Sequence, residues 1–277
     1  MTRDLSKFES AAADVFAGSM IPDLGPGVLT LGPCSVPAAP ADLAAAIEAK
    51  VRLPRRAIGN MWAAAQYVES RKFRATLNAI VEEAFALGVS GNPVHEWIAT
   101  ARPPLVVDTW YDDGLLNAYQ ARSQSWGWVQ GVSRNGEWID IFTRAYSADG
   151  TECKEGADPS WRSRIYKPHG LARKGSSFLM SDADYVEVLT EIDIQTPIPD
   201  EVKKRRQARG FLFLGCRFDD QLLRIFARQI MKRSRGPHYA VIPGELTRME
   251  KRFLEQQGIE RIDADLGFAV GILKQAA

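Results

Sequence analysis

The residues best suited to chemistry follow a short apolar run in the last third of the chain. Residues 211–214 read Phe-Leu-Phe-Leu, Gly215 ends the run, and Asp219 and Asp220 lead into an amphipathic segment over 222–230. A buried strand, a glycine turn and a helix that opens on acidic residues form the phosphate-facing corner of doubly wound α/β folds. The spacing therefore predicts a strand end that faces a nucleotide-type ligand.

A second candidate is His169, which follows a predicted strand over 164–167 and a proline. Imidazole titrates near neutral pH, so this histidine is a candidate general base. The alternative is a structural histidine in a turn. The other histidines, His95 and His238, are predicted to lie on a helix surface and at a strand end.

Two pairs of adjacent carboxylates, Asp112-Asp113 and Asp219-Asp220, also stand out. Adjacent residues on a helix do not share a face, so spacing alone does not make them a catalytic pair, and helix capping is the simpler interpretation for one of each. Cys34, beside Ser35, is either a thiol activated at a helix N-terminus or an inert buried cysteine. The second interpretation is favoured, because no base lies within sequence reach.

Composition limits the classes of partner. The chain has 277 residues, a net charge of +1, 45% hydrophobic and 25% charged residues, as in ordinary globular proteins. No global field attracts nucleic acid or an anionic membrane, and no run of about 18 apolar residues predicts a membrane span. Acidic residues near the N-terminus argue against a secretory signal. The three cysteines are far apart, which excludes a four-cysteine zinc site and predicts a reducing cytoplasm.

Hydrophobic periodicity predicts strands that alternate with helices. This alternation is typical of a mostly parallel sheet with helices on both faces, and it predicts a Rossmann-like α/β fold. The predicted strands are 28–31, 105–107, 164–167, 211–214, 238–242 and 259–262. The predicted helices are 4–16, one from about 41, 61–87 as one helix or two broken near Ser70, one from 93, 115–119, 181–192 capped by Ser181, and 245–257.

The segment over 120–163 departs from this alternation of strands and helices. Residues 126–132 and 138–142 read as strands that flank an Asn135-Gly136 turn, which is a strong hairpin signal. We expect a small β-hairpin insert outside the parallel sheet, within a single domain over 1–277. One face of its alternating tryptophans is expected to pack on the domain, and an exposed aromatic ribbon would instead be a partner surface.

Four of the predicted strands are followed by segments with candidate site residues, at 31–35, 108–112, 167–170 and 215–220. Their order and spacing resemble the sirtuin-like family, in particular its bacterial branch without zinc. That family has a Gly-Ala-Gly-x-Ser turn, then a Thr-x-Asn-x-Asp element, then His-Gly, then a Gly-x-Ser-type turn. The resemblance covers about residues 27–263.

The resemblance implies NAD binding and cleavage of the nicotinamide–ribose bond. Carried over residue by residue, it places Gly32 and Ser35 near the diphosphate and ribose, and Gly215 near the adenosine half. Asp112 would line the nicotinamide end and stabilise the ribosyl cation. His169 would be the base that activates a ribose hydroxyl.

The chain departs from the family pattern at several positions. Pro33 and Cys34 replace Ala-Gly, and a proline offers no N–H to a phosphate. Thr109 is also expected to contact the ligand. Trp110, the next residue, replaces the asparagine of the family pattern. Its indole would either stack on a ring of the ligand or plug the cleft. Arg217 replaces a small hydroxyl residue, and would bind a phosphate or fill the pocket.

Two functions are favoured at this point, and an unrelated α/β enzyme is the third alternative. The first is an NAD-type nucleotide-binding protein that hydrolyses NAD. The second is a catalytically degenerate relative that acts through a protein partner. A lysine deacylase is not expected, because the zinc module and the asparagine are both missing. No metal, membrane or nucleic-acid partner is expected.

Overall fold

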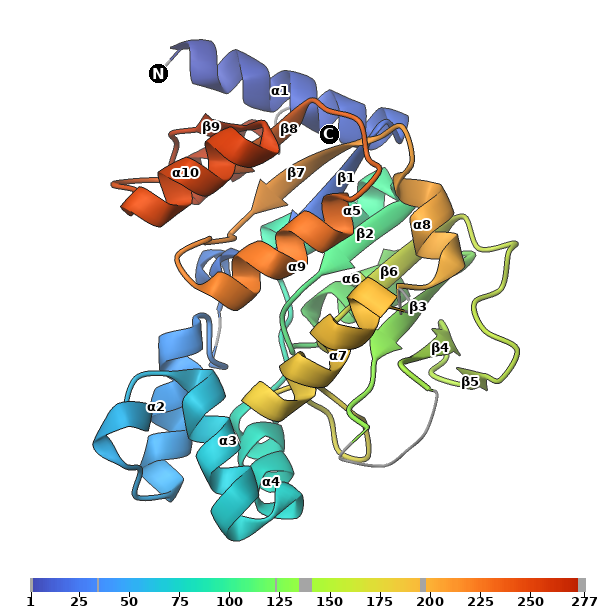
Figure 1. The fold of residues 1–277 in the computed structure, drawn as a ribbon. Helices are drawn as coiled ribbons and strands as arrows, with labels where there is room; N and C mark the ends of the chain where they lie inside the picture. The colour runs from blue at the N-terminus through green and yellow to red at the C-terminus, as the bar shows by residue number, and fades with distance from the viewer. Residues whose placement is uncertain (1, 34, 123, 135–140, 195–197, 274–277) are drawn as a thin grey trace.

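A single twisted sheet runs through the middle of the molecule (Figure 1). The computed structural model describes residues 2–33, 35–122, 124–134, 141–194 and 198–273. Within them, nine strands pair in the order β5-β4-β3-β6-β2-β1-β7-β8-β9. All pairs from β3 to β9 are parallel, and β4 and β5 join antiparallel at one edge. The strands are β1 (Met20–Leu24), β2 (Leu105–Asp108), β3 (Trp126–Gly131), β4 (Thr143–Ser147), β5 (Glu152–Cys153), β6 (Ser163–Lys167), β7 (Gly210–Leu214), β8 (His238–Val241) and β9 (Ile259–Ile262).

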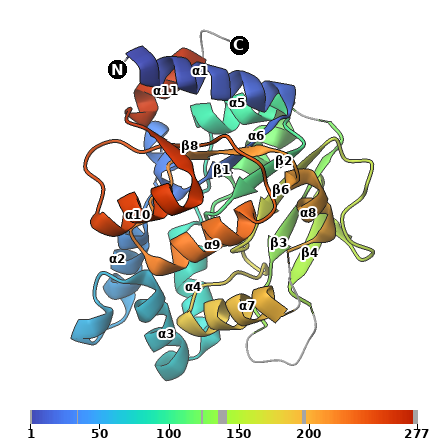
Figure 2. The same ribbon diagram turned by 45° about the horizontal axis from the view of Figure 1, so that its top comes forward.

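Helices cover both faces of this sheet, which confirms the predicted α/β Rossmann-like fold (Figures 1 and 2). One core joins a face of the sheet to α1, α5, α6 and α11, and a second core joins the other face to α8, α9 and α10. The helices are α1 (Thr2–Ala17), α2 (Pro40–Lys50), α3 (Met61–Lys72), α4 (Arg74–Ala84), α5 (Pro93–Ala101), α6 (Gly114–Arg122), α7 (Asp182–Ile194), α8 (Asp200–Arg206), α9 (Gln221–Met231), α10 (Arg248–Gln257) and α11 (Leu266–Leu273), with 3-10 turns η1 (Pro26–Leu31) and η2 (Arg55–Ala57).

The strands predicted from apolar runs at 105, 164, 211, 238 and 259 are confirmed. They were recognisable because parallel strands that are covered on both faces need apolar side chains at nearly every position. In β7, for example, Phe211 and Phe213 enter one core while Leu212 and Leu214 enter the other.

The first strand was predicted in the wrong place. Residues 28–31 form the 3-10 turn η1, with Val28 and Leu29 buried, and the strand itself is β1, eight residues earlier. Pro22 and Asp23 concealed β1, since proline and aspartate are both unfavourable in a central strand. β1 nevertheless lies at the centre of the sheet, between β2 and β7.

The segment over 120–163 extends the sheet. β3 and β4 pair antiparallel, which confirms a hairpin, but β3 also pairs in parallel with β6. The expectation that this segment lies outside the parallel sheet is therefore wrong for β3. Trp126 and Trp128 are buried, so the described part of the hairpin exposes no tryptophan ribbon. The predicted turn and most of the predicted second strand (135–140) lie outside the described residues.

Three helices, α2 to α4, form a module beside the carboxyl ends of the strands (Figure 1). The segment over 61–87 is two helices, α3 and α4, that meet at Phe73. Arg74 fastens the module to α7, because its guanidinium bonds to Asp184 Oδ2 and to the Phe178 carbonyl, each at 2.6 Å. As predicted, Ser181 caps α7, its Oγ accepting from the Asp184 N–H at 3.2 Å. Among the described helices, none has the combined length and apolar character needed to cross a bilayer.

Candidate functional site

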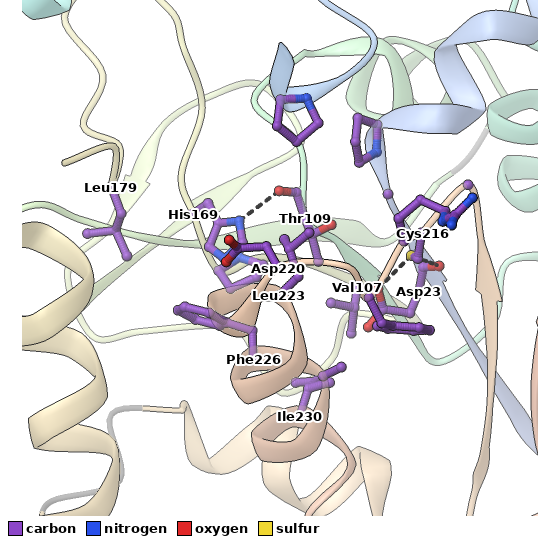
Figure 3. Close-up of a pocket in the computed structure, with 18 of the residues that line it drawn as sticks. Asp23, Val107, Thr109, His169, Leu179, Cys216, Asp220, Leu223, Phe226 and Ile230 are labelled. Carbon is purple, nitrogen blue, oxygen red and sulfur yellow. Dashed lines mark hydrogen bonds between the residues drawn. The ribbon is translucent and has the colours of Figure 1, made fainter. Parts of the chain in front are cut away.

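A cavity of about 490 Å³ lies where β1, β2, β6 and β7 end (Figure 3). This volume is in the range of small-molecule sites, about 300–1,000 Å³. Its walls come from the strand-end loops, from α9, and from the segments that begin α2 and α3. Of the residues predicted from sequence, Thr109, His169, Gly215 and Arg217 line it, and the other four do not.

His169 lies at the wall of this cavity. One of its ring nitrogens is hydrogen-bonded, and the other has no partner in the described structure. Its Nδ1 is 2.8 Å from the Thr109 carbonyl oxygen (Figure 3). A carbonyl can only accept, so Nδ1 carries the proton and Nε2 presents a lone pair. Nε2 is buried without a hydrogen-bond partner. The ring is held edge-to-face against Phe226, with centroids 4.5 Å apart.

Burial lowers the pKa of His169 from 6.5 to about 4, and the hydrogen bond to Thr109 opposes this shift only partly. The imidazole is therefore neutral at physiological pH, with Nε2 available to accept a proton. Its pKa in the empty cavity is below the near-neutral value expected from the sequence. A bound anion beside the ring would raise that pKa, because it favours the charged form.

The glycine turn at the first strand is Gly25-Pro26-Gly27. It packs backbone to backbone on the turn at Gly215, and a Cβ on Gly25 would come within 2.5 Å of the Gly215 carbonyl oxygen. Gly215 itself has a φ of +65°, which favours glycine. Neither contact tolerates a side chain, so both turns need their glycines.

The N–H groups of this turn are used within the fold. Gly25 donates to the Leu214 carbonyl at 2.9 Å, and Gly27 donates to the Gly215 carbonyl at 3.0 Å. Pro26 has no N–H. The turn therefore offers a ligand its close-packed shape rather than a set of donors.

The sequence analysis placed Gly32 and Ser35 at the turn after the first strand, but in the structure that turn is 25–27 and the two residues lie beyond it. Gly32 ends η1, and Ser35 is exposed on the loop before α2. Neither is among the described residues that line the cavity. Their misplacement follows directly from taking residues 28–31 as the first strand.

Trp110 neither stacks in the cavity nor plugs it. The indole Nε1 donates to the Pro37 carbonyl at 2.7 Å, and the ring packs on Phe85 and Tyr111. Both sequence-based interpretations of Trp110 are therefore wrong. It fixes the α2–α4 module to the end of β2, and the cavity remains open.

Asp112 is also turned away from the cavity. Its carboxylate is buried and accepts the Gly114 N–H at 2.8 Å, where α6 begins. Burial raises the pKa of this carboxyl. The helix-capping interpretation fits this geometry, and a place for Asp112 at the nicotinamide end does not.

Arg217 lies at the cavity and forms a two-pronged ion pair. Its Nε and Nη2 donate to the two carboxylate oxygens of Glu250 at 2.7 and 2.8 Å. These bonds to Arg217, together with backbone N–H donors, lower the pKa of Glu250 to about 2 although burial opposes them. Arg217 thus ties the turn after β7 to α10 and is also one of the residues that line the cavity.

The start of α9 brings further carboxylates to the cavity mouth. Asp220 caps the helix by accepting the Leu222 N–H at 2.7 Å, as the capping interpretation predicted. Asp219 and Asp220 both line the cavity. These groups reduce the attraction that the helix N-terminus would exert on an anion.

The sequence analysis missed Asp23, which lines the cavity from β1 (Figure 3). Its side chain is buried, and burial raises its pKa to about 8. The sequence does show an aspartate within the otherwise apolar run 20–24. Because this run was not predicted to be a strand, Asp23 could not be assigned to the edge of the sheet where the site lies. No group of three or more metal-ligating side chains occurs in the described part of the chain.

Part of the chain matches the model of a known family. Residues 104–262 match the model of the SIR2-like domain, which includes β2, β6, β7 and the loop that carries His169. A search of curated proteins finds no match.

Proposed function

This chain belongs to the family of SIR2-like domains, and on that premise we propose that it binds an NAD-type nucleotide in the cavity and hydrolyses the nicotinamide–ribose bond. The family indicates an NAD-related function. The hydrolysis is our proposal, and so is the placement of the chain in the bacterial branch of the family without zinc.

The observation that carries the proposal is the unpartnered, buried Nε2 of His169 at the cavity wall. An orphaned acceptor of this kind is costly unless a ligand completes it. The close-packed glycine turns fit a dinucleotide as well, because they let a ligand approach the backbone. Arg217 is the cationic side chain in the cavity lining that is available to a phosphate.

In the reaction we propose, water adds to the ribose carbon as nicotinamide leaves, and ADP-ribose and a proton are the other products. His169 accepts a proton at Nε2 from a ribose hydroxyl or from the attacking water. The Thr109 carbonyl holds the opposite edge of the ring through Nδ1–H and stabilises the imidazolium once it forms. Phe226 and its neighbours keep bulk water from the ring.

The test is nicotinamide release from NAD by the wild-type protein and by His169→Ala and His169→Gln. We expect release by the wild type and a loss of at least about 100-fold in both variants, the usual scale of general-base catalysis. At saturating NAD, the wild-type rate should stay level from pH 7 down to about 5, because the Nε2 lone pair remains free over that range. Circular dichroism checks that the variants fold.

The matched control is His238→Asn. His238 lies outside the cavity lining, and its Nδ1 accepts the Phe211 N–H, a role that the asparagine oxygen can take. This variant should keep the wild-type rate. Hydrolysis that survives in His169→Ala would overturn the role of His169.

The second candidate is a catalytically degenerate protein that acts through a protein partner. Two observations favour it: the N–H groups of the 25–27 turn are bonded internally, and Asp112 faces away from the cavity. It predicts no nicotinamide release over a long incubation. A raised melting temperature with NAD or ADP-ribose but no turnover would select a nucleotide-binding pseudo-enzyme, and no shift at millimolar ligand would rule out both nucleotide functions.

We also propose a reducing, cytoplasmic compartment. The basis is the three separated cysteines in the sequence. The two in the described residues, Cys153 and Cys216, are free thiols. Fractionation of cells that produce the native protein tests this assignment.

A further inference from the structure

A row of four side chains on neighbouring strands forms one wall of the cavity. Tyr166 in β6 is in register with Val107 in β2, Val107 with Asp23 in β1, and Asp23 with Phe213 in β7. All four line the cavity. The row is apolar or aromatic except for the carboxyl group at Asp23.

The opposite wall is the inner face of α9. Leu223, Phe226, Ala227 and Ile230 line the cavity from that helix. Figure 3 shows Leu223, Phe226 and Ile230 along α9, with Asp23, Val107 and Cys216 at the strand ends beyond it. The cavity therefore includes a space between an apolar helix face and a sheet layer that carries one polar group.

The carboxyl group of Asp23 is only weakly hydrogen-bonded by other side chains in the described structure. The side-chain partner recorded for its carboxyl in the described structure is the Cys216 thiol, with Sγ 3.8 Å from Oδ1. A thiol is a poor donor, and a buried carboxyl group held only in this way destabilises the fold. A residue that costs stability in a central strand and faces a cavity is expected to act on a ligand.

We propose that Asp23 is the specificity-determining residue of this cavity and binds a planar ring whose edge places a hydrogen-bond donor beside an acceptor. Two parts of an NAD-type nucleotide have this chemistry: the carboxamide of nicotinamide and the amino edge of adenine. The inference rests on the proposed function and deepens it, by assigning the recognition to a residue outside the segment that matches the family model.

The chemistry follows from the carboxyl group in its protonated form. A carboxylic acid has one O–H donor and one carbonyl acceptor about as far apart as the donor and acceptor of an amide or amino-imine edge. The two edges can form a pair of parallel hydrogen bonds. Phe213 and Tyr166 flank Asp23 in the row and provide apolar surface for the faces of the ring.

The surroundings keep this carboxyl group protonated. Burial raises the pKa of Asp23 to about 8, and the nearby charge of Asp108 acts in the same direction, while the Cys216 thiol opposes them. The other ionisable groups around it are Lys167, which pairs with Asp108, and Arg217, Asp219, Asp220 and His169 in the cavity lining. The wild-type site therefore loses its O–H donor as the pH rises through 8.

The experiment measures the affinity of nicotinamide, adenosine and NAD by calorimetry for the wild type, Asp23→Asn and Asp23→Leu, at pH 6.5 and pH 9. For the wild type we expect binding about tenfold weaker at pH 9, where about a tenth of the carboxyl remains protonated. Asp23→Asn should show the same affinity at both pH values, since an amide keeps a donor and an acceptor at any pH. Asp23→Leu should bind at least about tenfold more weakly while unfolding at a higher temperature.

The matched control is Asp149→Asn in the exposed turn between β4 and β5, which should keep the wild-type pH dependence. NAD should show the pH effect that depends on Asp23. If nicotinamide shows the same effect, Asp23 binds the nicotinamide ring; if adenosine shows it, Asp23 binds the adenine ring. Equal affinity of Asp23→Leu and the wild type, or the same fall at pH 9 in Asp23→Asn, would overturn the inference and leave the proposed function intact. No binding of NAD to the wild type would instead overturn the proposed function.

Discussion

At the scale of single residues, the buried pair Lys167–Asp108 holds the loops of the site together. Lys167 Nζ donates to Asp108 Oδ2 at 2.6 Å and to the Trp110 carbonyl at 2.7 Å, and the Asp108 and Lys167 side chains are almost fully buried. Because Thr109 and His169 follow these two residues closely, the pair fixes the ends of β2 and β6 where the imidazole meets its carbonyl partner.

We therefore expect Lys167→Met to destabilise the protein by about 3–5 kcal/mol, since it leaves the buried Asp108 carboxylate without its charged partner and with the Trp110 N–H as its remaining donor. The measurement is the midpoint of urea unfolding. The double variant Asp108→Leu/Lys167→Met removes both charges and should recover much of the loss. A double variant no more stable than the single one would contradict this account.

At the scale of elements, the site depends on two turns in backbone contact. The turn at 25–27 connects β1 to η1, and the turn at Gly215 connects β7 to α9. A Cβ on Gly25 would lie 2.5 Å from the Gly215 oxygen and 2.8 Å from the Cys216 Cα, so backbone rather than a flexible side chain would have to move. The φ of Gly25 is −99°, which any residue adopts, so contact alone requires glycine here.

Gly25→Ala should lower the free energy of unfolding by about 1–3 kcal/mol, the usual effect of overpacking, and should weaken NAD binding by moving α9. Urea unfolding and calorimetry measure the two effects. The control is Gly271→Ala in α11, where an added Cβ meets no atom within 4 Å and should be neutral or slightly stabilising. An unchanged Gly25→Ala protein would argue against the turn-to-turn contact.

At the scale of the whole molecule, buried ionisable groups set the pH of greatest stability. His95 is buried in α5, so its predicted place on a helix surface is wrong. Burial lowers the pKa values of His95 and His169 to about 4, so the fold favours their neutral forms. That stabilisation is complete above about 6.5 and is lost as the pH falls toward 4. Asp23 acts in the opposite direction, because the fold favours its protonated form and loses that contribution as the pH rises from about 4 to 8.

The two trends predict a maximum of stability near pH 6.5. Below it, the contributions of His95 and His169, at about 3 kcal/mol each over the full range, outweigh that of Asp23. Burial also raises the pKa values of Asp108 and Asp112, which therefore act in the same direction as Asp23. Urea unfolding at pH 4.5, 6.5 and 8 tests this. Asp23→Asn should lessen the decline from pH 6.5 to 8, and His169→Gln should reduce the acid loss. Wild-type stability that rises steadily from pH 6.5 to 8 would contradict the assignment.

Much of the architecture could be predicted from residue types alone. Apolar runs identified five of the parallel strands, and the Ser181 and Asp220 caps marked the start of α7 and α9. His169 and Gly215 were identified because each follows a strand, and the ends of parallel strands meet at one edge of a sheet. These features depend on neighbours in the chain, which the sequence displays.

The sequence by itself determined the α/β class, the strand ends after β2, β6 and β7, and the histidine at the cavity, because each is a local pattern of burial or capping. Only the tertiary structure decided which turn meets Gly215, where Trp110 and Asp112 point, and that Asp23 lies in a central strand. The physical reason is that Pro22 and Asp23 have poor strand propensity, and β1 forms only because pairing with β2 and β7 outweighs it.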